Sequence, residues 1–463
     1  MTTSAYAHFI GIGGAGMSGL ARVLHDRGVV VTGSDLKASR YASALQEAGI
    51  TVHIGHAAEN LGDPEVVVIS SAIPETNPEV RAARERGIPV WPRAKMLAHI
   101  AGEDACVAVA GTHGKTTTSS MMATALDGMG LDPTFLIGGE LNDMGANARC
   151  GRGGHCVVEA DESDGSFLYL NPKVSIITNV EADHLDHYGS FEAVVDTFGQ
   201  FIEKTPADGS VVVCADDAGL VRLARERSSA PVVTYGFHAD ADVRCESPVR
   251  QGMGHRFNVR LRDGRLLETA VSVPGIHNVV NATGVLAAVV SLGLDVRAAA
   301  SVLGAFSGVR RRFDHIGEAA GVTVVDDYAH HPTEVRATLA AAKDAGFERV
   351  WVVFQPHRYS RTQALGTDFG EAFGDADKVV LMDVYSAGEA PIPGVSGKTL
   401  LHAMLEHEPR TQAAYFPHRD EIEGYLADRV RPGDLVMTMG AGDVTTLGAG
   451  FVRAIAGRAG GSV

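Results

Sequence analysis

A short segment of the chain combines glycines, a lysine and threonines at the spacing of a phosphate-binding loop. The segment, GTHGKTTT, runs from Gly111 to Thr118 between a predicted strand and a predicted helix. In such a loop, backbone N–H groups wrap phosphate oxygens, Lys115 would neutralise charge on the β and γ phosphates, and Thr116 would bind Mg²⁺. The full pattern GxxxxGK[ST] has a glycine where Val109 stands, so the loop is a shorter variant. A glycine-rich turn with a solvated lysine is the alternative, and the flanking elements argue against it.

Carboxylates and a histidine follow two later predicted strands. Glu159, Asp161 and Glu162 come after one strand, and Asp183 and His184 come after the next. In an open α/β sheet, ligands bind beyond the carboxyl ends of the strands, where these groups could converge on the phosphate loop. Each cluster alone fits a solvated loop or helix cap as well as a metal site. Their shared position favours magnesium beside a bound nucleotide.

A second glycine-rich loop lies near the N-terminus. The residues from Gly11 to Gly16 read GIGGAG, which matches GxGxxG between a strand and a helix, and Asp35 ends the next predicted strand. The pattern is a dinucleotide fingerprint, but its physical content is the close approach of backbone to a pyrophosphate at a helix N-terminus. Any diphosphate ligand would satisfy it. A tight turn without a ligand is the alternative.

Three further loops rich in polar and aromatic residues follow predicted strands in the last third of the chain. They cover residues 326–332, 355–361 and 383–389 and read DDYAHHP, QPHRYSR and DVYSAGE. Arg358 and Arg361 could hold a carboxylate or phosphate by paired hydrogen bonds, which a lysine does less well. A zinc site at His330 and His331 is the weaker alternative, because adjacent histidines rarely share a metal and no cysteine accompanies them.

The elements that position these loops alternate between strand and helix along the whole chain. A length of 463 residues suggests three domains, and we place them at 1–103, 104–310 and 311–463. The predicted class is α/β, with a mainly parallel sheet in each domain: Rossmann-like, then P-loop ATPase-like, then Rossmann-like. Residues 241–273 are expected to form an excursion of antiparallel strands, with a hairpin turn at Asp263-Gly264.

Composition limits the possible partners and the compartment. The formal net charge of -16 argues against binding to nucleic acid. No apolar run approaches the ~18 residues of a membrane span, and no signal peptide is recognisable, so we expect a cytoplasmic protein without membrane insertion. Five scattered cysteines are expected to be reduced and structural. A disulfide between Cys150 and Cys156 is the less favoured alternative.

Taken together and in order, the motifs resemble those of the Mur ligase family, and within it the members that attach L-alanine to UDP-N-acetylmuramate. The resemblance covers nearly the whole chain. Its segments are GIGGAGMSG (11–19), GTHGKTTT (111–118), EADESD (159–164), ADHLDHY (182–188), GIHNVVNA (275–282), RRRFD (310–314), DDYAHHPTE (326–334), QPHRYSRT (355–362) and DVYSAGE (383–389). It implies a bacterial enzyme of peptidoglycan precursor synthesis that activates the lactyl carboxylate of the sugar with ATP, as an acyl phosphate, before the amine of L-alanine attacks.

The resemblance also implies site residues. It changes the N-terminal loop from an NAD site to one for UDP-N-acetylmuramate, with Gly11, Gly13, Gly14, Ala15, Gly16, Met17, Ser18, Asp35 and Ser70. It assigns ATP to Gly111, Thr112, His113, Gly114, Lys115, Thr116, Thr117, Asn278, Asn281, Arg312 and Asp327. Mg²⁺ (or Mn²⁺) would be held by Thr116, Glu159 and His184, and the amino acid by Tyr328, His330, His357, Arg358 and Arg361. The implied catalytic residues are Lys115, His184, Arg358 and Arg361.

The chain departs from the family pattern at two places. Several Mur ligases have a carbamoylated lysine shortly after the metal-binding histidine, but here no lysine occurs between His184 and Lys204, so we predict none. Ala329 stands where glycine is usual. We expect a monomer or weak homodimer.

Other functions stay open at this point. The nearest alternative is the sister ligase that attaches a preformed peptide to UDP-N-acetylmuramate during wall recycling, although the loop from Arg358 to Arg361 favours the alanine enzyme. A dehydrogenase would leave Lys115, Glu159 and His184 without a task. A catalytically silent nucleotide-binding protein would be expected to lose them.

Overall fold

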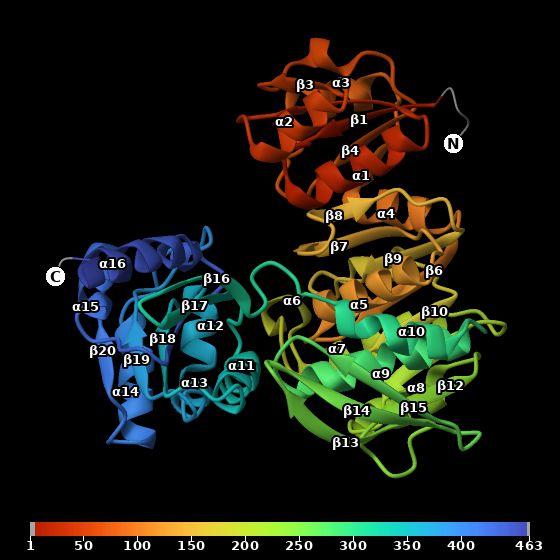
Figure 1. The fold of residues 1–463 in the computed structure, drawn as a ribbon. Helices are drawn as coiled ribbons and strands as arrows, with labels where there is room; N and C mark the ends of the chain where they lie inside the picture. The colour runs from red at the N-terminus through yellow and green to blue at the C-terminus, as the bar shows by residue number, and fades with distance from the viewer. Residues whose placement is uncertain (1–4, 461–463) are drawn as a thin grey trace. The chain divides into compact units, whose positions relative to one another are not determined.

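The computed structural model describes residues 5–460 and contains three separate β-sheets, each flanked by helices (Figure 1). The chain folds as two compact units. The first holds the residues up to Ser247 with Phe257–Ala270 and Val280–Phe306, and the second holds Pro248–Arg256, Val271–Val279 and the residues from Ser307 onward. The predicted α/β class with three mainly parallel sheets is confirmed.

The first sheet has five parallel strands in the order β3-β2-β1-β4-β5. Its central strand β1 is almost fully buried, as expected for a strand covered by helices on both faces. The strands are β1 (Tyr6–Ile10), β2 (Val30–Asp35), β3 (Thr51–Ile54), β4 (Val66–Ile69) and β5 (Val90–Pro92). The helices are α1 (Ala15–Asp26), α2 (Arg40–Glu47), α3 (Pro78–Glu85) and α4 (Arg93–Ala101).

The second sheet has ten strands in the order β15-β14-β13-β12-β11-β10-β6-β9-β7-β8. Around the buried strand β6 the pairing is parallel, whereas β7 and β8 form an antiparallel hairpin at one edge. The strands are β6 (Ala105–Ala110), β7 (Thr134–Leu141), β8 (Ala146–Arg149), β9 (His155–Glu159), β10 (Val174–Ile177), β11 (Ser210–Cys214), β12 (Val232–Gly236), β13 (Val243–Gln251), β14 (Gly254–Leu261) and β15 (Leu266–Val271). The helices are α5 (Lys115–Gly128), α6 (Leu185–Tyr188), α7 (Phe191–Glu203), α8 (Ala218–Arg227), α9 (Ile276–Ser291) and α10 (Val296–Val302).

The third sheet has six strands in the order β16-β17-β21-β18-β19-β20, and all pairs except β16 with β17 are parallel. The strands are β16 (Asp314–Ala319), β17 (Val322–Asp327), β18 (Arg349–Phe354), β19 (Lys378–Leu381), β20 (Ala413–Tyr415) and β21 (Asp434–Met439). The helices are α11 (Pro332–Asp344), α12 (Tyr359–Ala364), α13 (Gly366–Gly370), α14 (Gly397–His407), α15 (Ile422–Ala427) and α16 (Gly448–Gly460).

Other expectations can be compared with this fold. The strands expected between 241 and 273 are present as β13 to β15, and the turn at Asp263-Gly264 joins the last two with Gly264 at a φ of 87°. All five cysteines are free thiols, so the alternative of a Cys150–Cys156 disulfide is wrong. In the described part of the chain, no helix is both long and apolar enough to cross a membrane.

Candidate active site

The phosphate loop lies between β6 and α5, as the sequence predicts. Gly111 and Gly114 have φ values of 133° and 83°, which side-chain-bearing residues rarely adopt. A Cβ on Gly111 would also collide with the hydroxyl of Thr178. The loop therefore needs both glycines, and it delivers Lys115 to the first position of α5, where the helix dipole favours an anion.

The ammonium group of Lys115 is held by three oxygen atoms. Its Nζ donates to the carbonyls of Gly111 (2.7 Å) and Thr112 (3.1 Å) and to Oε1 of Glu162 (2.8 Å). Burial lowers the pKa of Lys115, but Glu162, Glu159 and Asp161 together raise it more, so the lysine stays charged. Burial raises the pKa of Glu162 to about 7, against the opposing effect of Lys115. Oε2 of Glu162 is buried without a hydrogen-bond partner among the described residues.

The residues expected to hold magnesium lie around the start of α5. The hydroxyl of Thr116 donates to Oε1 of Glu159 (2.9 Å), and the N–H of Gly138 donates to Oε2 (2.7 Å). His184 has a φ of 54°, and its Nε2 lies 3.5 Å from Asp183 and 3.9 Å from Glu162. The two acidic clusters predicted from separate strand ends thus meet beside Lys115.

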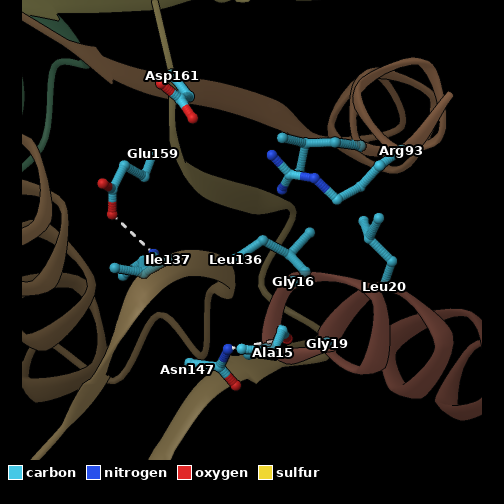
Figure 2. Close-up of a pocket in the computed structure, with 13 residues that line it drawn as sticks. Ala15, Gly16, Gly19, Leu20, Arg93, Leu136, Ile137, Asn147, Glu159 and Asp161 are labelled. Carbon is cyan, nitrogen blue, oxygen red and sulfur yellow. Dashed lines mark hydrogen bonds between the residues drawn. The ribbon is translucent and has the colours of Figure 1, made fainter. Parts of the chain in front are cut away.

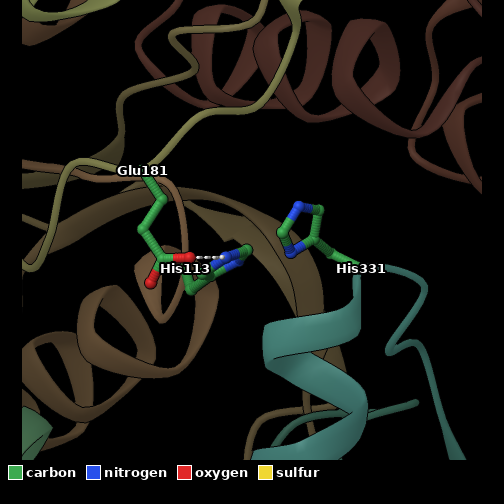
Figure 3. A group of neighbouring side chains, drawn as sticks. All are labelled: His113, Glu181 and His331. Atoms are coloured by element: carbon green, nitrogen blue, oxygen red, sulfur yellow. Dashed lines mark ion pairs between the residues drawn. The ribbon is translucent and has the colours of Figure 1, made fainter. Parts of the chain in front are cut away.

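Further residues lie against the phosphate loop from the segment that follows β10 and from α9. The Asn179 side chain accepts from the N–H of His113 (2.9 Å) and donates to its carbonyl (3.1 Å). The His113 ring forms an ion pair with Glu181 at 3.5 Å, shown by the dashed line in Figure 3. Asn281 lies beside Gly114, because a Cβ added to Gly114 would be 3.1 Å from Oδ1 of Asn281. Asn179 and Glu181 were missed in the sequence, although they adjoin the predicted ADHLDHY segment.

The N-terminal glycine loop is braced by polar side chains. Oδ2 of Asp35 accepts from the N–H of Gly13 (2.9 Å), and the hydroxyl of Ser39 donates to the carbonyl of Gly13 (2.9 Å). Gly14 caps α1 and supplies no side-chain acceptor to the first-turn N–H groups. This is the arrangement expected of an anion site at a helix N-terminus. Ser70 borders the loop beside Gly11, and Met17 and Ser18 are buried in α1.

A cavity of about 100 Å³ within the first unit lies between the N-terminus of α1 and the acidic residues at the carboxyl end of β9 (Figure 2). Ala15 and Gly16 line one side, and Glu159 and Asp161 line the other. Asn147, on β8, donates to the carbonyl of Ala15 (3.2 Å). The predicted diphosphate loop and a predicted magnesium ligand therefore border one cavity.

The expected amino-acid residues belong to the second unit and lie after β17 and β18, next to a third loop that follows β19. Asp327 is buried. Its Oδ1 accepts a hydrogen bond from the N–H of Ala329, and its Oδ2 accepts one from the N–H of Phe313, each at 2.8 Å. Burial raises the pKa of Asp327 to about 6. Ala329 has no positive φ, so this loop does not need glycine there. In this structure Asp327 shapes the loop that carries Tyr328 and His330.

Four rings from these loops pack in a row. The ring centroids of Tyr328 and His330 are 5.2 Å apart, those of His330 and His357 are 5.8 Å apart, and those of His357 and Tyr385 are 5.7 Å apart. Burial, and then the positive charge of Arg361, lower the pKa of His357 to about 4. Burial is also the main cause that lowers the pKa of His330 to about 4. Both imidazoles are therefore neutral near pH 7.

Arg358 is held by an acidic partner that the sequence analysis missed. Its Nε donates to Oε1 of Glu389 (2.6 Å), and Glu389 also accepts from the N–H (3.0 Å) and hydroxyl (2.6 Å) of Ser360. Burial opposes the ionisation of Glu389, but these bonds lower its pKa to about 2. The backbone of Arg358 has a φ of 71° and a ψ of 134°, an uncommon conformation for a non-glycine residue.

The remaining predicted residues have separate partners. Nη1 of Arg312 lies 3.9 Å from Oε1 of Glu334, with its guanidinium 5.3 Å from the ring centroid of Tyr328. Asn278 donates to the carbonyl of Pro274 (2.7 Å). His331 caps α11, while the ring of His330 packs against Tyr328 and His357, so the two histidines face different partners and offer no shared zinc site.

Comparisons with known proteins agree with one another along the chain. The models described as "Mur ligase family, catalytic domain", "Mur ligase middle domain" and "Mur ligase, glutamate ligase domain" match residues 6–104, 109–289 and 311–442. The UDP-N-acetylmuramate–L-alanine ligase of Rubrobacter xylanophilus is 51% identical over 444 residues, covering 95% of this chain and 98% of that protein.

Solved structures show the same similarity. The UDP-N-acetylmuramate–alanine ligase MurC of Thermotoga maritima has a TM-score of 0.80 and 31% identity, covering 99% of this chain and 100% of that one. A murein peptide ligase of Psychrobacter arcticus has a TM-score of 0.71 and 25% identity, covering 98% and 99%.

Proposed function

The chain belongs to the Mur ligase family, and on that premise we propose that it joins L-alanine to the lactyl carboxylate of UDP-N-acetylmuramate in peptidoglycan precursor synthesis. The reaction uses ATP, as in the rest of the family. The observation that carries the proposal is the cavity bordered by Gly16 on one side and by Glu159 and Asp161 on the other. A sugar nucleotide whose diphosphate lies at Gly16 would extend toward the nucleotide phosphates.

The residues around Lys115 fit a magnesium nucleotide. Thr116, Glu159 and Glu162 offer oxygen ligands, which Mg²⁺ prefers, and Oε2 of Glu162 is a buried acceptor without a partner among the described residues. We assign Thr116, Glu159 and His184 to the metal. Bound there, Mg²⁺ would neutralise charge on the γ-phosphate during transfer.

The first step is phosphoryl transfer. An oxygen of the lactyl carboxylate attacks the γ-phosphorus, the bond to the β-phosphate oxygen breaks, and ADP leaves with that electron pair. Lys115 stabilises the charge that spreads over the transferring group, and the N-terminus of α5 adds backbone donors. To do so, Lys115 must exchange its contacts with Gly111, Thr112 and Glu162 for phosphate oxygens.

The second step forms the amide. The amine of L-alanine attacks the acyl carbon, and the tetrahedral intermediate collapses with loss of inorganic phosphate and of the amine proton. Arg358 and Arg361 are proposed to hold the alanine carboxylate, since arginine pairs with carboxylates in a fixed planar geometry. Neutral His330 and His357 would not repel the ammonium group of the incoming amino acid.

The peptide ligase of wall recycling is not favoured, because relatives with about half of their residues identical to this chain are alanine ligases. We also propose that the enzyme acts in the cytoplasm and that it is a monomer or weak homodimer.

Phosphate release by the purified protein tests the proposal. ATP, Mg²⁺ and UDP-N-acetylmuramate are supplied with L-alanine, with the tripeptide or with no acceptor. Release that depends on L-alanine supports the assignment, release only with tripeptide would transfer it to the peptide ligase, and release with neither would contradict ligase activity. The variant Lys115→Ala, which should be inactive, controls for contaminating ATPases.

A further inference from the structure

We propose that Arg93 binds the diphosphate of the sugar nucleotide, acting together with the N-terminus of α1. The inference rests on the proposed function and adds a residue that no motif of the sequence singled out. Arg93 is the first residue of α4 and reaches into the cavity between Gly16 and Asp161 (Figure 2). Nothing in its local sequence, WPRAK, marks it as a ligand-binding residue.

Arg93 feels one acidic neighbour but is not bonded to it, since its charge is among the causes that lower the pKa of Asp161, after the Ser163 N–H and Lys115. In the described structure, its side chain makes no hydrogen bond or ion pair, whereas Lys115 and Arg358 each have an acidic partner. Among the described residues that line the cavity, Arg93 is the one cation, facing the acidic Glu159 and Asp161. A half-buried guanidinium without hydrogen bonds is costly, so its donors are expected to meet a ligand.

The position of Arg93 does not serve its own helix. A positive charge in the first turn of a helix opposes the helix dipole, and the first turn of α4 contains no acidic residue to offset it. Stability of α4 would favour an acidic or neutral residue at this point. The residue type is therefore better explained by what the side chain reaches than by the element that carries it.

The neighbour of Arg93 in the cavity identifies the anion. A Cβ on Gly16 would lie 3.0 Å from Nη1 of Arg93, so the guanidinium lies against the first turn of α1. Gly16 has no positive φ, which means that space, not backbone conformation, demands glycine there. The N–H groups in the first turn of α1 and the planar guanidinium of Arg93 are thus adjacent. Together they can donate hydrogen bonds to the same diphosphate.

The lactyl carboxylate is the other anion of the substrate, and the geometry does not favour it. That group must reach the γ-phosphate near Thr116 and Glu159, at the acidic side of the cavity. Arg93 lies against Gly16 on the opposite side. We therefore assign it to the diphosphate, and the two assignments predict different binding behaviour for UDP, which has the diphosphate but lacks the lactyl group.

Calorimetric titration of the full-length protein with UDP tests the assignment. We expect Arg93→Ala to bind UDP about 10- to 100-fold more weakly than wild type, the range for losing a charge-assisted hydrogen-bonded pair. Arg93→Lys should recover part of the loss, because it keeps the charge without the planar fork. Lys95→Ala, which removes an exposed charge two residues along the same helix, is the matched control and should bind normally.

Kinetics provide the second readout. Arg93→Ala should raise KM for UDP-N-acetylmuramate while leaving KM for ATP unchanged, which a general loss of folding would not do. Unchanged UDP affinity in Arg93→Ala would overturn the assignment, including the case in which only UDP-N-acetylmuramate binds more weakly, since that pattern identifies the lactyl carboxylate. Failure of the wild-type protein to bind UDP would overturn the diphosphate site itself, while L-alanine-dependent phosphate release tests the proposed reaction independently.

Discussion

The ammonium nitrogen of Lys115 lies 2.8 Å from Oε1 of Glu162, so the principal cation of the phosphate loop is paired with a buried carboxyl group of its own chain. The pair forms between the first residue of α5 and the segment that follows β9. It keeps Lys115 at the mouth of the loop, close to where a γ-phosphate would lie, and gives Glu162 the partner that its burial requires.

Replacing Lys115 by alanine should reduce kcat for phosphate release by about 10³-fold, the order found when a group that stabilises transition-state charge is removed. The fold should persist, because Glu162, whose pKa is already about 7, can take up a proton when its partner is lost. Thermal melting and phosphate release would be measured together, with exposed Lys204→Ala as control. Activity within tenfold of wild type would contradict the role of Lys115.

Glu159→Gln should increase the Mg²⁺ concentration needed for half-maximal activity by at least about 10-fold, because a neutral amide is a poor ligand for a hard cation. Thr116→Val should act in the same direction, since its hydroxyl lies 2.9 Å from Glu159. Activity titrated against Mg²⁺ measures the change, and Asp208→Asn, at an exposed carboxylate, is the control. An unaltered Mg²⁺ requirement in both variants would remove these residues from the metal site.

Glu389→Gln should raise KM for L-alanine by about 10-fold, the effect of weakening a charge-assisted hydrogen bond. The reason is positional, because Glu389 fixes both Arg358 and the N–H of Ser360. KM for UDP-N-acetylmuramate should stay unchanged. Glu371→Gln, at an exposed carboxylate that pairs with His407, supplies the comparison. Equal changes in both KM values would indicate a general disturbance and not a positioning role.

Acidification should destabilise the second unit through His330 and His357. Their pKa values of about 4 lie below the unfolded value of 6.5, so between these limits the unfolded chain binds more protons than the folded one. Stability therefore falls as the pH falls from 6.5 to 4. Melting temperatures across this range should decline less in the double variant His330→Gln/His357→Gln. Parallel declines in variant and wild type would contradict the two low pKa values.

Much of the fold could be predicted because its strands are continuous apolar runs. CVAVAG, SVVVCAD and RVWVVFQ are buried parallel strands, and their lengths and flanking glycines distinguish them from helices. The β7–β8 hairpin was missed, because TFLIGGEL and ANAR contain a glycine pair and polar residues that resemble a loop. Strand β16 was missed for a similar reason, since DHIGEA is a half-exposed edge strand with a weak apolar pattern.

The candidate site also contains residues that could be predicted from the sequence and residues that could not. Lys115, Thr116 and the glycines could be recognised in the sequence, because their chemistry depends on spacing within one loop. Arg93, Glu389 and the pairing of Lys115 with Glu162 depend on side chains brought together by the sheet, and a single sequence does not encode such distances in a local pattern. The family resemblance supplied the UDP assignment, which the glycine loop alone could not distinguish from NAD.

The left-handed backbone at Arg358 has a practical consequence for protein engineering. A φ of 71° costs a non-glycine residue roughly 1–3 kcal/mol, a cost that glycine would largely avoid. A library screened only for heat resistance should therefore tend to enrich Arg358→Gly. This variant relieves the backbone strain but lacks the guanidinium proposed to bind the amino acid. Efforts to raise the melting temperature of this enzyme should keep arginine at position 358, because a substitution that stabilises the fold there is expected to lower the activity.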